Sequence, residues 1–287
     1  MRKISLLLLL SIFVFASVRA QETSEDKTVG TMVSKRGVNI LPEAGEIGLG
    51  VDALPFIEFF GNAFNGNVGN TGSFEFVDNT NSIVGKYMLT ESSDIRARLR
   101  IGKGTSTDVE YIMKDTLPVP DPMVTVEDIY KSSYSNIVFG VGYEMSRGKG
   151  RVQGFYGGEL FMQYMSYSTD YEYGNDFTPD FTNPNTTNFF TGNITGTGRV
   201  LETNGMNTFT FGVRGFIGVE YFFTPKVSIG GEFGWAFGMS KTSDYTSVEE
   251  QWDGLQIQEV ESKTAGGSSW ALDTDNASGG VFLTFYF

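Results

Sequence analysis

The feature that most constrains the fold is an alternation of apolar and polar residues with a period of two. It is clearest in the stretch NTFTFGVRGFIGVEYFF, where every odd position from Phe209 to Phe223 is apolar or glycine. The even positions there include threonine, glycine, arginine and glutamate, and the pattern returns from Val227 to Met239. Successive side chains of a β-strand point to opposite faces, so each stretch predicts a strand with one apolar and one polar face.

The alternation extends over most of the chain and predicts eight strands. Short segments, TESSD, SRGKG and FTPK, join three consecutive pairs, whereas the connections at about 60–80, 109–131, 171–204 and 243–275 are long. An even strand count with short turns at one end and long loops at the other is typical of outer-membrane barrels. We therefore predict an all-β, eight-stranded, antiparallel, up-and-down transmembrane β-barrel with short periplasmic turns and long extracellular loops. The predicted strands are 46–59, 81–90, 94–108, 132–146, 151–170, 205–223, 226–242 and 276–287.

The first residues predict export. Arg2 and Lys3 precede an apolar run of about 13 residues, and a small-residue cleavage site ends at Ala20. We assign 1–20 as a cleaved signal peptide, 21–45 as a periplasmic N-terminal tail and 46–287 as the barrel. The segment GVNILPEAG within the tail is apolar enough to fold against the periplasmic mouth of the barrel.

Composition excludes several functions. Removing the signal peptide leaves 21 − 3 = 18 basic residues against 34 acidic ones, a net charge of −16, which repels nucleic acid. The chain contains neither histidine nor cysteine, so disulfides and the usual zinc and copper ligand sets are absent. The known outer-membrane acyltransferases, phospholipases and proteases need a catalytic histidine. We expect no enzymatic activity, no cofactor and no metal site.

The alternative fold is a soluble eight-stranded barrel, which would point its apolar face inward. In the membrane fold the polar face points inward, and the five acids and five bases on it balance one another. Each buried charge needs a partner, so this balance suits a narrow interior packed with side chains. The predicted interior charges are Asp52, Lys86, Arg96, Arg98, Arg100, Glu144, Glu159, Arg214, Glu220 and Glu232.

Three of these charges leave two functions open. Arg96, Arg98 and Arg100 share one face of a strand, so they either line an anion path or pair with Glu144, Glu220 and Glu232. Eight strands enclose a space just wide enough for side chains, which favours the paired, closed interior. The alternative is a narrow, low-conductance channel for small solutes.

The chain ends in an apolar strand, GGVFLTFYF. The residues Val281, Leu283, Phe285 and Phe287 share one face, which is expected to contact lipid, with Tyr286 near the periplasmic rim. This strand is expected to pair with the first, so that no strand edge remains in lipid. Its aromatic end resembles the signal read by the barrel-assembly machinery. Deleting Phe287 is expected to impair assembly and leave export intact.

The long loops are the expected place of function. The connection 171–204 is rich in Asn, Thr and aromatic residues, which suit sugars or partner proteins. The residues Asp273, Asp275 and Asn276 offer oxygen ligands of the kind that calcium prefers, without the full spacing of an EF-hand. The tripeptide at Asp115 to Leu117 resembles a short O-glycosylation signal with Thr116 as the acceptor.

Over nearly the whole exported chain, the strand count, the loop alternation and the aromatic C-terminus resemble small outer-membrane barrels of the OmpX and OmpA-transmembrane kind. The segments GVNILPEAGEIGLGVDALPFIEFFGN and GKYMLTESSDIRARLRIG are similar in style to barrels of Bacteroidetes-type envelopes. The resemblance implies an integral outer-membrane protein, surrounded by lipid bilayer and lipopolysaccharide, that acts structurally or as an interaction or adhesion protein. Its partner would be a larger envelope complex or an extracellular ligand at the loops.

Overall fold

A computed structural model describes residues 32–52, 83–117, 119, 121–189, 194–195, 198–274 and 280–287. Twelve strands run through these residues, and within these ranges no helix is long and apolar enough to cross a membrane. The predicted signal peptide lies outside the described residues. The strands are β1 (Ile47–Asp52), β2 (Ile83–Thr90), β3 (Ser93–Met113), β4 (Thr125–Lys149), β5 (Val152–Glu172), β6 (Ile194–Thr195), β7 (Gly198–Thr224), β8 (Val227–Thr242), β9 (Tyr245–Trp252), β10 (Ile257–Thr264), β11 (Ser268–Thr274) and β12 (Gly280–Tyr286).

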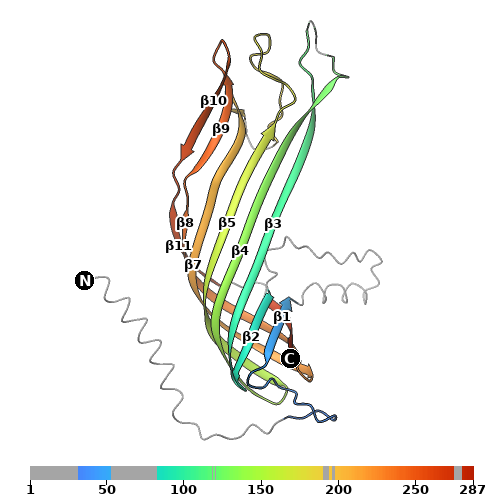
Figure 1. The fold of residues 1–287 in the computed structure, drawn as a ribbon, viewed down its shortest axis with the longest axis vertical. Coiled ribbons are helices and arrows are strands. Elements are labelled where there is room, and N and C mark those ends of the chain that lie inside the picture. Colours follow the sequence, from blue (N-terminus) through green and yellow to red (C-terminus); the bar gives the residue numbers. More distant parts are fainter. Residues whose placement is uncertain are drawn as a thin grey trace, which may run out of the picture.

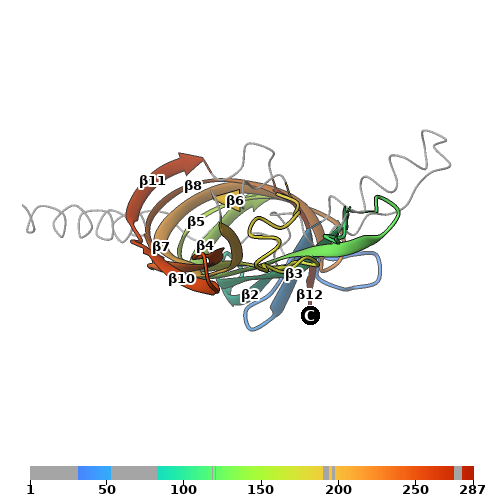
Figure 2. The same ribbon diagram turned by 90° about the horizontal axis from the view of Figure 1, so that it is seen from above.

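Eight strands close into an antiparallel ring in the order β1-β2-β3-β4-β5-β7-β8-β12 (Figures 1 and 2). The predicted pairing of the last strand with the first is confirmed, because Leu49 lies opposite Phe285 and Val51 opposite Leu283. The predicted short connections are also found, and each has two residues: 91–92, 150–151 and 225–226. We call the end of the ring that carries them the short-turn end, and the opposite end the long-strand end.

The strands differ greatly in length. Strands β1, β2 and β12 have 6 to 8 residues, whereas β3, β4, β5 and β7 have 21 to 27. At about 3.3 Å per residue, the 25 residues of β4 extend over roughly 80 Å. In Figure 1 these long strands rise side by side far beyond β1 and β2.

The predicted long loop 109–131 is wrong, because β3 and β4 pair up to Met113 and Thr125 and leave only 114–124 as the connection. The prediction failed because the stretch of β3 directly after Lys103, residues 104–108 with the sequence GTSTD, is polar on both faces. The apolar alternation fades there, but the backbone ladder continues. The predicted start of β7 at 205 is likewise late, since the strand begins at Gly198.

The predicted loop 243–275 is also corrected, because it contains a hairpin of β9 and β10 followed by β11. Strand β7 has two partners on the same side: β9 from Gly198 to Asn204 and β8 from Thr208 onward. The turn residue Asp253 accepts backbone hydrogen bonds from Gln256 and Leu255, which hold the pKa of its carboxyl below the usual value. An Asp-Gly pair is a strong hairpin signal, so this turn was readable in the sequence.

The faces of the ring strands alternate as the sequence indicates. In β7, Arg214 and Glu220 are buried inside, whereas Val213, Ile217 and Val219 are exposed outside. The interior nevertheless holds aromatic rings as well as charges. The side chains of these rings point to the inner face of the strands, as the charged ones do. They include Phe155, Phe216, Phe222 and Tyr286.

Interior glycines make room for these rings. Gly218 lies opposite Phe155, and a β-carbon at Gly218 would lie 2.1 Å from the ring of Phe155. A β-carbon at Gly157 would lie 2.5 Å from the ring of Phe216. The aromatic rings therefore pack against the bare backbone of the neighbouring strand.

The segment before β1 covers the mouth of the ring at the short-turn end. The side chain of Ile40 is 3% exposed and packs in one cluster with Met88, Phe222 and Tyr286. The ammonium of Lys226 donates to the backbone carbonyl of Leu41 at 2.9 Å. This segment belongs to the region predicted as an N-terminal tail, and its apolar part lies where the sequence placed it.

Candidate functional site

The interior of the ring near the short-turn end is filled by ion pairs. They join four basic and four acidic side chains from β2, β3, β4, β5, β7 and β8. We call these eight residues the interior network: Lys86, Arg96, Arg98, Arg214, Glu144, Glu159, Glu220 and Glu232. Because the signs balance, each buried charge has a partner within the network.

The lower part of the network centres on Glu144. Its two carboxylate oxygens accept from Lys86 Nζ at 2.6 Å and from Arg96 Nη1 at 3.2 Å. Lys86 Nζ also lies 3.8 Å from Glu220 Oε2. The carboxylate of Glu220 accepts further hydrogen bonds from Ser228 and from the hydroxyl of Tyr286. Six strands are thereby linked across the ring.

The upper part of the network centres on Glu159 and Glu232. Glu159 Oε1 lies 2.7 Å from Arg98 Nη2, and its other oxygen lies 3.8 Å from Arg96 Nε and 3.9 Å from Arg214 Nη1. Glu232 accepts from Arg96 and Arg214, each at 2.6 Å. The side chain of Glu159 is completely buried. It fits because residue 140 beside it is glycine, where a β-carbon would lie 2.2 Å from Glu159 Oε1.

The aromatic rings of the interior stack against the cations of the network. The ammonium of Lys86 lies 4.9 Å from the ring centre of Phe155, and the guanidinium carbon of Arg96 lies 4.2 Å from that of Phe216. A cation over an aromatic face is attracted by the ring quadrupole. These contacts fill the remaining space with apolar surface and leave the charges in a rigid arrangement.

The structure differs in detail from the predicted pairing. Arg98 pairs with Glu159, where Glu144, Glu220 and Glu232 were predicted as partners of the three arginines. Arg100 is buried on the same face of β3. The side chain of Asp52 lies outside the described residues. The sequence reasoning missed Asp94, which is 2% exposed and shares the parity of Arg96 along β3.

The predicted loop 171–204 is folded over its first part, at the long-strand end. The buried carboxylate of Asp128 on β4 accepts from the backbone N–H of Gly174 at 2.9 Å, from Thr186 Oγ1 at 2.8 Å and from the N–H of Thr187 at 3.0 Å. The amide of Asn175 donates to the carbonyl of Met113, on β3. We call residues 173–189 the outer loop; β3 and β4 hold it in place.

One cation of the outer region is enclosed by aromatic rings of this loop. The guanidinium of Arg199, 3% exposed, lies 4.2 Å from the ring centre of Tyr173 and 4.8 Å from that of Phe177. Its Nε donates to Glu250 on β9 at 2.6 Å. The loop, β7 and β9 are thereby joined, so the outer loop has a fixed shape.

The remaining candidate residues are placed as follows. Phe285 and Phe287 are exposed on the outer face of β12, Val281 and Leu283 are half-buried, and Tyr286 is buried in the mouth. Thr116 is half-buried, and the neighbouring Asp115 accepts from the backbone N–H of Asn185. The calcium candidates Asp275 and Asn276 lie outside the described residues. Within the described ranges, no group of three or more Asp and Glu side chains is arranged to hold a metal ion.

Comparisons with known proteins leave the family open. No protein-family model and no curated protein matches the chain. Among solved structures, the chain is similar to the outer membrane protein OprG from Pseudomonas aeruginosa, with 9% identity and a TM-score of 0.30 over 86% of this chain and 98% of that one. A major outer membrane protein from Thermus thermophilus gives 9% identity and a TM-score of 0.30 over 84% and 98%. Similarity this low carries no functional argument, and the resemblance to OmpX-like and Bacteroidetes-type barrels stays a prediction.

Proposed function

We propose that the chain is a non-enzymatic, integral outer-membrane β-barrel whose interior is closed and whose long-strand end binds a partner outside the cell. The observation that carries the proposal is the inverted polarity of the ring: ion pairs fill the inside, and apolar side chains cover the outside. A water-soluble protein rarely exposes so continuous an apolar surface. Lipid is the solvent that such a surface matches.

The height of the apolar band supports this position. On the outer face of β5, the band of exposed apolar side chains runs from Val152 through Tyr156, Leu160 and Met162 to Tyr164. A tilted strand crosses a bilayer in about 9 to 11 residues, and tyrosines gather at both interfaces. The band on β5 is long enough to cross a bilayer, and Tyr164 lies at its outer end. The partners implied by the position are the lipid bilayer, lipopolysaccharide and the barrel-assembly machinery.

A closed interior follows from two layers at the short-turn end. The interior network fills the ring from β2 to β8, and the segment around Ile40 packs beneath it. A closed ring with no path for solutes is the expected consequence, and the alternative is the narrow channel for small solutes. Planar-bilayer recordings of the refolded protein distinguish them. We expect no openings, whereas stepwise openings would establish the channel.

The outer region supports the interaction role. Hydrogen bonds to Asp128 and Asn175 fix the outer loop before any partner arrives, which reduces the entropy lost on binding. At the tip of the β3–β4 hairpin, Tyr111, Leu117 and Met123 are exposed. Aromatic and methionine side chains are enriched at protein interfaces. An extracellular ligand or a larger envelope complex is the expected partner class.

Two experiments test the proposal. Folded outer-membrane barrels resist SDS, so the purified protein is expected to change its gel mobility on boiling and to remain with membranes at high salt. Recovery from the soluble periplasm without any heat-dependent shift would contradict the membrane position. For the interaction role, a photocrosslinking residue at Met123 in living cells is expected to capture a partner. The same label at Phe285, on the outer face of the ring, serves as the control.

A further inference from the structure

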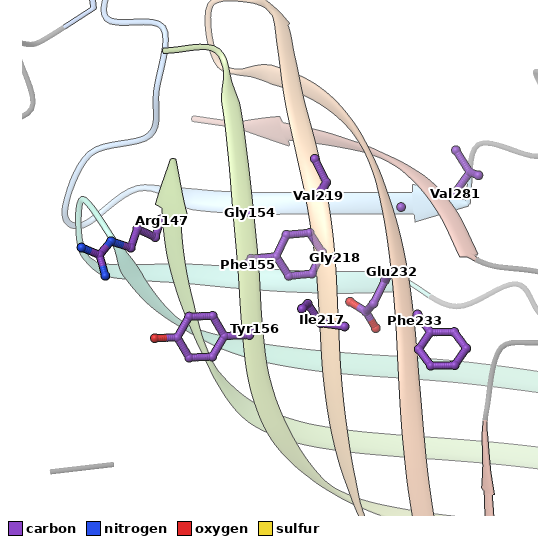
Figure 3. A pocket seen from close by; sticks show the side chains of 11 residues that line it. Arg147, Gly154, Phe155, Tyr156, Ile217, Gly218, Val219, Glu232, Phe233 and Val281 are labelled. Atoms are coloured by element: carbon purple, nitrogen blue, oxygen red, sulfur yellow. The ribbon is translucent and has the colours of Figure 1, made fainter. Parts of the chain in front are cut away.

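The outer wall of the ring has a hollow near the short-turn end. One row of residues crosses five neighbouring strands, because the pairings align Arg147, Gly154, Val219, Gly231 and Val281. A groove of about 680 Å³ follows this row. Figure 3 shows Tyr156, Ile217 and Phe233 along one side of it, and Arg147 at one end. These three side chains come from the next row, in which β5, β7 and β8 pair Tyr156 with Ile217 and Ile217 with Phe233.

The floor of the groove is not required by the packing of the protein. A β-carbon at Gly154 would have its nearest neighbour, the carbonyl oxygen of Arg147, at 3.4 Å, which is an ordinary contact. By contrast, a β-carbon at the interior Gly218 would lie 2.1 Å from an aromatic ring. The fold therefore needs glycine at 218 but has space for a side chain at 154. The small residue at 154 therefore leaves an apolar hollow on the outer face, beside the row of Tyr156, Ile217 and Phe233.

The charge at the end of the groove is free to bind an anion. Arg147 is exposed, and it has no carboxylate partner among the described residues. Lys149, two residues further along β4, and Arg151, in the turn that follows, add positive charge nearby. A guanidinium binds phosphate through two parallel hydrogen bonds. An apolar groove that ends at an unpaired arginine has the shape and polarity of a lipid site.

We propose that this groove binds one phospholipid, with an acyl chain lying over Gly154 and Gly231 and the phosphate on Arg147. The inference rests on the proposed membrane position. We propose a phospholipid and not lipopolysaccharide because Arg147 lies at the short-turn end, three residues before the turn glycine Gly150. In the proposed orientation this end faces the inner leaflet, where glycerophospholipids present their phosphates.

Native mass spectrometry tests the site on the protein purified in mild detergent, with phosphatidylglycerol added as the probe. The wild type is expected to retain one lipid. Arg147→Gln is expected to weaken retention by about tenfold, the loss of one charge-assisted contact. Gly154→Leu is expected to abolish it by filling the groove.

Two matched variants serve as controls. Gly158→Leu places the same side chain on the same strand and face, beyond the lining of the groove, and Lys149→Gln removes a neighbouring positive charge. Both are expected to retain the lipid as the wild type does. If Lys149→Gln weakens binding as much as Arg147→Gln, the attraction is general and the site is refuted. Retention of lipid A instead of phosphatidylglycerol, or a dimer formed through this face, also overturns it.

The two proposals fail in different ways. If the protein changes its gel mobility on boiling but retains no phosphatidylglycerol, the proposed membrane position stands and the proposed lipid site is refuted. A protein that shows no such shift and stays soluble contradicts the proposed membrane position, on which the lipid site depends. For every variant, the change of gel mobility on boiling is therefore measured together with lipid binding. A variant that is misfolded is thereby distinguished from one that is folded but has lost the lipid site.

Discussion

The interior network makes a quantitative prediction at Glu159. The substitution Glu159→Gln preserves the shape of the side chain and removes its charge. The carboxylate is completely buried and lies 2.7 Å from Arg98, 3.8 Å from Arg96 and 3.9 Å from Arg214. Its loss leaves the four cations of the interior network facing three carboxylates, around a side chain that water does not reach. Removing one partner of a buried ion pair costs about 3–5 kcal/mol, because the other charge stays buried without compensation. We expect the free energy of unfolding to fall by that amount.

The assay is guanidinium unfolding of the protein in lipid vesicles, followed by tryptophan fluorescence. The control is Glu172→Gln, the same change on the same strand, where the carboxylate pairs with Lys131 in solvent. Exposed ion pairs contribute little, so the control is expected to leave the unfolding midpoint unchanged. Adding Arg98→Met to Glu159→Gln restores the charge balance and is expected to recover part of the loss. A shift for Glu159→Gln no larger than that of the control would refute the reasoning.

Three further predictions follow from single contacts. Gly218→Ala forces a β-carbon into an aromatic ring and is expected to lower stability by about 1–3 kcal/mol, whereas Gly215→Ala, with open space beside it, is expected to leave the unfolding midpoint nearly unchanged. Asp128→Ala removes three hydrogen bonds from the outer loop, so limited proteolysis is expected to cut within 173–189 while the heat shift on gels persists. If the loop stayed protected from protease in that variant, Asp128 would not be the residue that holds it in place. Ile40→Asp is expected to expose the segment before β1 to protease without opening the ring, and continued protection there would show that Ile40 does not hold it.

The alternation of residues was enough to predict the class of fold. Arg214 and Glu220 share one parity on β7, and Val213 and Ile217 the other, so the inside and outside of the strand were readable in advance. The same is true of the two-residue turns, because each of them interrupts the alternation. The alternation says nothing about strand length where both faces are polar, which is why the outer parts of β3 and β4 and the β9–β10 hairpin were predicted as loops.

What the sequence determined by itself is the polarity of each face and most of the charges that share the interior, although Asp94 was missed, because both follow from a period of two along one strand. Which charges pair was decided by the tertiary structure. Arg98 lies beside Glu159 across 61 positions, and Arg96 beside Glu232 across 136, and such distances are set by the tilt and register of strands around the ring. The groove at Arg147 is also a tertiary property. The row of residues along it comes from five strands, and only the register places them side by side.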